Sequence, residues 1–229
     1  MTSPAFPETA TTLTLPGPAG GLEVAVDPPE ADARAQPVVA LICHPLPTEG
    51  GTMHNKVVTM TARALRELGA TTVRFNFRGT GASEGAFDHG DGEVEDLRAV
   101  VAWVRAARPN DALWLAGFSF GAYVSLRAAA DLQPALLLSI APPAGRWDFD
   151  RIVTPTMPWR VLQGEEDEVV DPQAVYDWFD KVAAHHPDAE LVRMPETSHF
   201  FHRKLMDLRG AIKHFAQPYL PEPPADPAG

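Results

Sequence analysis

The sequence is poor in cysteine and in positive charge. Of its 229 residues only Cys43 is a cysteine, so no intrachain disulfide can form and packing must hold the fold. A reducing compartment such as the cytoplasm is then acceptable. Lys and Arg number 19 against 30 Asp and Glu, a formal net charge of -11. Phosphate binding needs clustered basic side chains, so this balance argues against a nucleic-acid partner.

Long apolar runs are also missing. The first ten residues, MTSPAFPETA, have neither the basic cluster nor the apolar stretch of a signal peptide. No apolar run approaches the ~18 residues of a spanning helix. We therefore expect a cytoplasmic protein that is not embedded in a membrane. Residues 11–216 are expected to form a single α/β domain between flexible, proline-rich ends at 1–10 and 217–229.

Within the expected domain, short apolar segments alternate with amphipathic ones. This alternation predicts an α/β fold whose mostly parallel sheet of about seven to eight strands is flanked by helices. Several predicted strands are uniformly apolar, as strands buried on both faces should be. The expected strands are 22–26, 38–43, 71–75, 113–118, 135–140, 160–163 and 190–194. The expected helices are 54–68, 93–107, 122–131, 172–184 and 204–216.

A Gly-x-Ser-x-Gly pattern, Gly117-Phe118-Ser119-Phe120-Gly121, lies between an apolar strand and a helical stretch. A sharp strand-to-helix turn lifts the serine hydroxyl off the sheet and leaves little room two residues to either side, where glycine fits. A cluster of loop residues without function is the alternative. The strand before and the helix after favour a nucleophile elbow with Ser119 as the nucleophile.

A serine hydroxyl is a weak nucleophile, so an acid and a histidine base should follow downstream. Five acidic residues lie in the loop 164–172, after a predicted strand. Asp167 is our choice for the acid, whereas Asp171 fits a helix N-cap. His199 follows the last predicted strand and is our choice for the base, with His202 as the alternative.

Stabilising an oxyanion needs two backbone N–H groups, one of them from the residue after the nucleophile, Phe120. The second should come from the loop after the strand 38–43. Leu46 is the best candidate there, because Pro45 and Pro47 have no N–H. We interpret His44 as a structural histidine that hydrogen-bonds this loop.

Three motifs in this order resemble a branch of the α/β-hydrolase superfamily: His44-Pro45 with Gly50-Gly51-Thr52-Met53-x-Asn55-Lys56-Val57, then FNFRGTGASEG at 75–85, then GFSFG at 117–121. The branch consists of small, lid-poor bacterial serine hydrolases related to dienelactone-hydrolase-like proteins, and the similarity spans about 38–199. It implies a Ser-Asp-His triad, no cofactor, and hydrolysis of esters or thioesters. Dienelactone-hydrolase-like relatives use a cysteine nucleophile, where this chain has Ser119. Related sequences usually read His-Pro-His-Pro in the first motif; this chain has Leu46 at the third position, and a backbone donor survives the change.

About seventeen residues, 141–157, occupy the place where larger relatives insert a lid. The acyl pocket should therefore be open and suit a small-molecule ester or thioester with a short or exposed acyl group.

The turn 79–85 does not match a dinucleotide-binding pattern. No metal site is expected, because neither His-Glu-x-x-His nor Cys-x-x-Cys accompanies the histidines. An acyltransferase, a peptidase or a noncatalytic binding protein remain alternatives, and the chain is expected to be a monomer or homodimer.

Overall fold

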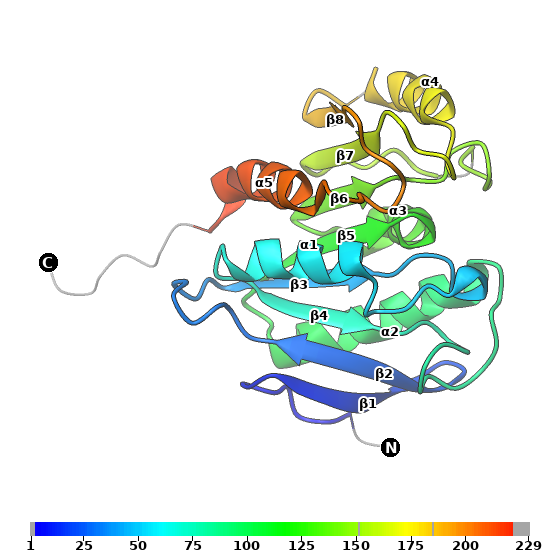
Figure 1. Ribbon diagram of the computed structural model, residues 1–229. Helices are drawn as coiled ribbons and strands as arrows, with labels where there is room; N and C mark the ends of the chain where they lie inside the picture. The colour runs from blue at the N-terminus through cyan, green and yellow to red at the C-terminus, as the bar shows by residue number, and fades with distance from the viewer. Residues whose placement is uncertain (1–2, 151, 185, 222–229) are drawn as a thin grey trace, which may run out of the picture.

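A computed structural model describes residues 3–150, 152–184 and 186–221, and an eight-stranded sheet forms its centre (Figure 1). The strand order is β1-β2-β4-β3-β5-β6-β7-β8. β1 pairs antiparallel with β2, and β2 pairs antiparallel with β4, whereas the other neighbours are parallel. The strands are β1 (Thr11–Gly17), β2 (Gly20–Asp27), β3 (Val38–Cys43), β4 (Thr71–Phe75), β5 (Ala112–Phe118), β6 (Leu136–Ile140), β7 (Trp159–Gly164) and β8 (Ala189–Met194).

Helices cover both faces of the sheet (Figure 1). They are α1 (Lys56–Arg66), α2 (Asp91–Ala107), α3 (Phe120–Leu132), α4 (Pro172–Ala183) and α5 (Leu205–Ala216). Apolar residues of α2, α3 and α4 share one core cluster, and those of α1 and α5 share the other. Successive side chains of a strand point to opposite faces. In β3, accordingly, Leu41 belongs to the first cluster and Ile42 to the second. This two-sided burial explains why the strand is uniformly apolar.

The predicted strands and helices are confirmed to within two residues at each end. β1 was not predicted, because only Leu15 of its seven residues is buried and the remaining pattern is weak. A glycine in the left-handed region follows α1. Gly69 has φ +94°, and a Cβ there would lie 2.0 Å from the carbonyl oxygen of Arg34.

Described residues near both ends of the chain make specific contacts. Phe6 packs on Trp103, with ring centroids 5.0 Å apart, and the indole N–H of Trp103 donates to the carbonyl of Pro4 at 2.8 Å. A short 3-10 helix (Gln217–Tyr219) follows α5 at the other end. Phe6 and Tyr219 therefore pack on rings of the expected domain, those of Trp103 and Phe215. Residues 1, 2 and 222–229 lie outside the described residues.

Among the described helices, none has both the length and the apolar character needed to cross a bilayer.

The segment between β6 and β7 folds back onto the protein. Phe149 is buried there, 5.5 Å from the ring centroid of Tyr123 and 4.8 Å from that of Trp178. Because this packing holds the segment down, the described part of it forms no lid over the carboxyl ends of the strands.

Candidate active site

Ser119 lies at the turn from β5 into α3, with φ 52° and ψ -120°. A residue other than glycine in such a conformation costs of order 1–3 kcal/mol and persists only where its surroundings enforce it. Here its N–H donates to the carbonyl of Ile140 at 2.8 Å, and its own carbonyl accepts the N–H of Ala122 at 2.8 Å. The sheet and the first turn of α3 therefore hold the strained conformation in place.

The two glycines of the motif are required by close backbone contacts. A Cβ at Gly117 would lie 2.2 Å from the carbonyl oxygen of Gly121. A Cβ at Gly121 would lie 2.3 Å from the carbonyl oxygen of Cys43. Both obstacles are backbone atoms, which cannot rotate away. The crowding inferred from the sequence pattern is thus confirmed.

Three side chains from separate loops meet at this turn. The Oγ of Ser119 lies 3.1 Å from Nε2 of His199, and Nδ1 of His199 lies 2.8 Å from Oδ2 of Asp167. His199 is 2% exposed and Ser119 is 8% exposed. The loops follow β5, β7 and β8, and the carboxyl ends of parallel strands lie along one edge of a sheet, where ligand chemistry collects. The structure therefore brings together the serine, acid and histidine chosen from the sequence.

The carboxylate of Asp167 is held by more than His199. Its Oδ1 accepts the backbone N–H groups of Val169 at 2.9 Å and Val170 at 2.7 Å, and its Oδ2 accepts the side-chain N–H of Gln163 at 3.1 Å. Burial by itself opposes ionisation, but the bonds from His199 and the two backbone N–H groups outweigh it, so the pKa of Asp167 lies below its ordinary value. Asp167 is therefore ionised at neutral pH.

Two side chains that support the site were missed in the sequence. Gln163 is fully buried, and a second polar residue beside Arg160 in the mostly apolar strand β7 was the available signal. Glu168 accepts the backbone N–H of His199 at 3.1 Å, but nothing distinguished it from its acidic neighbours. In contrast, Asp171 is confirmed as the N-cap of α4, because its carboxylate accepts the N–H of Gln173 at 3.0 Å.

His44 shapes the loop that follows β3. Burial lowers its pKa to about 4, so the ring is neutral at pH 7. Nε2 accepts the N–H of Phe77 at 3.0 Å, which leaves the proton on Nδ1 to donate to the carbonyl of Pro45 at 2.6 Å. The structural role inferred for His44 is confirmed. Leu46 and Phe120 are the two residues chosen for the oxyanion hole. Their backbone N–H groups donate no hydrogen bond to any described residue.

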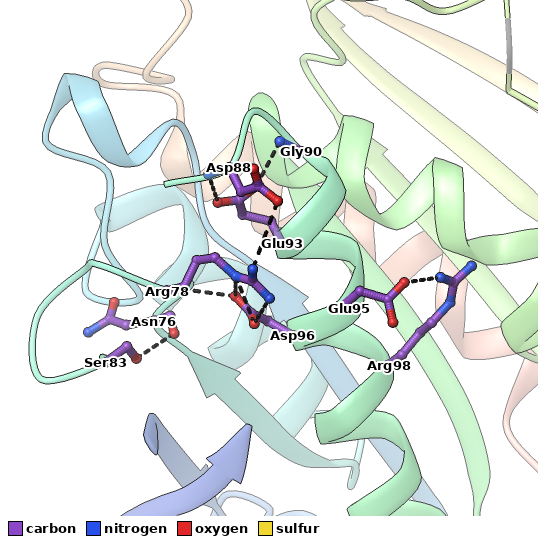
Figure 2. A network of polar contacts seen from close by, with 9 residues as sticks. All are labelled: Asn76, Arg78, Ser83, Asp88, Gly90, Glu93, Glu95, Asp96 and Arg98. Carbon is purple, nitrogen blue, oxygen red and sulfur yellow. Dashed lines mark hydrogen bonds and ion pairs between the residues drawn. The ribbon is translucent and has the colours of Figure 1, made fainter. Parts of the chain in front are cut away.

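The motif at 75–85 contacts both this loop and α2, and Figure 2 shows its contact with α2. The guanidinium of Arg78 bonds the buried carboxylate of Asp96, with Nη2 2.8 Å from Oδ1, and so ties the turn to α2. Asn76 accepts the N–H of Met53 at 2.8 Å, and its own carbonyl accepts the hydroxyl of Ser83 at 2.6 Å. The motif thus serves as a shaped turn, in agreement with the interpretation from the sequence.

A cavity of about 370 Å³ opens beside Ser119. Its wall includes both expected oxyanion residues, the histidine, two charged side chains and two further aromatic side chains: Leu46, Phe120, His199, Glu49, Arg146, Trp147 and Phe200. In the described residues, no cluster of three or more His, Cys, Asp or Glu side chains is arranged to hold a metal ion.

The fold, the strained serine and the uncovered cavity define an α/β serine hydrolase without a lid. Residues 22–156 match the family described as X-Pro dipeptidyl-peptidase (S15 family), and the chain belongs to this family. The match includes the serine turn and ends before Asp167 and His199. The grouping of those two side chains with Ser119 therefore comes from the geometry.

Proteins of similar sequence and structure agree with this class. XC6422 from Xanthomonas campestris, described as an α/β serine hydrolase without lid, is 65% identical; the comparison covers 97% of this chain and 100% of XC6422, with a TM-score of 0.92. An α/β serine hydrolase homologue from Coxiella burnetii is 44% identical, covering 92% and 99% of the two chains, with a TM-score of 0.86. A further relative, to which its name assigns no class, is the uncharacterized protein RP471 of Rickettsia prowazekii (strain Madrid E), 33% identical over 77% of each chain.

Proposed function

We propose that this serine hydrolase cleaves carboxylic esters or thioesters with short or exposed acyl groups, using Ser119, His199 and Asp167 as its triad. The observation that carries the proposal is the continuous chain of hydrogen bonds from Asp167 through His199 to Ser119, at the wall of an open cavity. Such a chain activates a hydroxyl that is otherwise a weak nucleophile.

In the proposed reaction, Oγ of Ser119 attacks the carbonyl carbon while Nε2 of His199 takes the hydroxyl proton. The N–H groups of Phe120 and Leu46 stabilise the tetrahedral oxyanion. As the intermediate collapses, His199 gives the proton to the departing alcohol or thiol, leaving an acyl-enzyme. Water then attacks with His199 again as base, and Ser119 leaves as the free hydroxyl. Asp167 stays ionised throughout and holds the proton on Nδ1 of the imidazole.

The preference for small acyl groups follows from the size and openness of the cavity. At about 370 Å³ it lies near the lower end of the ~300–1,000 Å³ range of ligand pockets. Because the segment between β6 and β7 packs onto the protein body, a long acyl chain would extend into water. The expected substrates therefore have few carbons beyond the carbonyl group.

Cleavage of peptides is the second candidate, because the family's description names a dipeptidyl-peptidase. Glu49 in the cavity wall is an anion that the N-terminal ammonium of a peptide would meet. Turnover of an Ala-Pro 4-nitroanilide faster than that of 4-nitrophenyl acetate would favour this candidate. We expect the reverse order, since no other described feature selects a dipeptide.

The decisive test is labelling with a fluorophosphonate, which reacts with activated serines. We expect the wild type to be modified at Ser119, as located by mass spectrometry, and Ser119→Ala and His199→Ala to remain unlabelled. Ser125→Ala is the matched control. It removes a buried serine of α3, the helix that follows Ser119, outside the cavity, and this variant should label normally. A folded wild type that is neither labelled nor active on 4-nitrophenyl acetate would favour a noncatalytic binding protein instead.

The expected acyl length is tested by comparing 4-nitrophenyl butyrate with 4-nitrophenyl laurate. A preference for the laurate would contradict the expected short acyl group.

A further inference from the structure

Arg146 is the cationic side chain in the wall of the cavity beside Ser119. It lies in a tight turn between β6 and β7, where its N–H donates to the carbonyl of Pro143 at 3.1 Å and a backbone bridge joins Ala144 to Trp147. Its Nη1 donates to the carbonyl of Val169 at 3.0 Å. An arginine head has five N–H donors, so this single bond orients the guanidinium and leaves donors for a ligand.

Most described arginines are neutralised by a carboxylate of the protein, as Arg78 is by Asp96. Arg146 is different, because it forms no ion pair with any residue in the described part of the chain. In a protein with a formal net charge of -11, a cation that has no counterion among the described residues and lines the cavity of the nucleophile is positioned for an external anion.

Two further observations concern the surroundings of Arg146. Trp147, next to Arg146, packs on Phe120 with ring centroids 4.9 Å apart, and Phe120 is a proposed oxyanion donor. The turn that carries Arg146 is therefore packed against the residue that follows the nucleophile. Glu49 also lines the cavity and makes no ion pair with Arg146. An anionic group is therefore attracted to one part of the wall and repelled from another, which orients the substrate.

We propose that Arg146 binds a carboxylate carried by the acyl group, so that the preferred substrates are half-esters or half-thioesters of short dicarboxylic acids. The guanidinium matches a carboxylate in shape and can donate two parallel hydrogen bonds to it. The inference rests on the proposed hydrolase function. It adds that a negative charge at the far end of a short acyl group increases kcat/KM.

The test compares mono-4-nitrophenyl glutarate with 4-nitrophenyl pentanoate, in which a methyl group replaces the carboxylate. For the wild type we expect a higher kcat/KM with the glutarate. Arg146→Gln should lower the glutarate-to-pentanoate ratio of kcat/KM at least tenfold, mainly through KM, because the lost contact is present in both ground and transition states. Glu49→Gln should raise the ratio. Arg63→Gln, an equal change of charge on the outer surface of α1, is the matched control and should stay within twofold of the wild-type ratio.

Each outcome separates this inference from the function on which it rests. If Arg146→Gln reduces turnover of both esters equally, the side chain is structural and the carboxylate site is wrong. If the wild type hydrolyses pentanoate and shows no gain with glutarate, the hydrolase function stands and the inference fails. If neither ester is cleaved and the fluorophosphonate does not label Ser119, the proposed function itself fails. A preference for a carboxylate on the alcohol part would overturn the placement of Arg146 on the acyl side.

Discussion

Replacing Asp167 by Asn should abolish most of the activity while leaving the fold intact. The reason lies in the contacts of the carboxylate. Val169 and Val170 donate two backbone N–H groups to Oδ1, so the amide oxygen of an asparagine must occupy that position. Its NH₂ group then faces His199, where Oδ2 of the carboxylate accepts the imidazole proton in the wild type. Two N–H donors cannot face each other, so the imidazole proton moves from Nδ1 to Nε2.

With the proton on Nε2, His199 points a donor at the hydroxyl of Ser119 and has no lone pair to accept its proton. The corresponding change of a triad aspartate lowers kcat by ~10⁴-fold, equivalent to about 5.5 kcal/mol of transition-state stabilisation. We expect a loss of this order in kcat/KM for 4-nitrophenyl acetate. The rate of fluorophosphonate labelling should fall in parallel, because both reactions need the same proton transfer.

The matched control is Asp171→Asn. It makes the same chemical change in the same loop, but at a helix cap, where asparagine serves as well as aspartate. Circular dichroism and thermal unfolding should show both variants folded, and the control should keep activity within about twofold. A loss of less than tenfold in the Asp167→Asn variant would refute the reasoning and assign the acid to another residue of the loop.

Three further outcomes concern stability, each measured by urea or thermal unfolding. Asp96→Asn should lower the free energy of unfolding by about 3–5 kcal/mol, because it leaves the mostly buried Arg78 without its buried carboxylate partner and with only the exposed Asp88 at 3.9 Å. Glu95→Gln, in an exposed pair of the same helix, should lower it by under about 1 kcal/mol. Gly121→Ala should unfold the protein or lower its stability by more than about 3 kcal/mol, because its Cβ meets backbone. Two cations hold the pKa of Glu67 at about 2 against the cost of burial. Glu67→Gln should therefore lower the free energy of unfolding by about 2 kcal/mol at pH 7. This difference between variant and wild type should decrease below pH 4.5 and vanish near pH 2.

Most strands and helices, and the serine turn, follow from local sequence patterns. Uniformly apolar segments predict strands buried on both faces, and the glycines around Ser119 are explained by contacts between backbone atoms near the turn. The positions of Asp167 and His199 after successive strands were also readable, because parallel strands end at one edge of the sheet. β1 was not, since it is stabilised by pairing with β2 and buries little of its own.

Only the tertiary structure decided which polar residues near the strand ends act together. Five acidic residues compete in the loop after β7, and Asp167 is distinguished by facing His199 across 32 positions of sequence. The support from Gln163 and the cation at Arg146 likewise depend on contacts that no local pattern encodes. Periodicity and turn chemistry act between near neighbours in the chain. The order of strands in the sheet and the packing of loops at its edge set the remaining distances, and these determine the chemistry of the site.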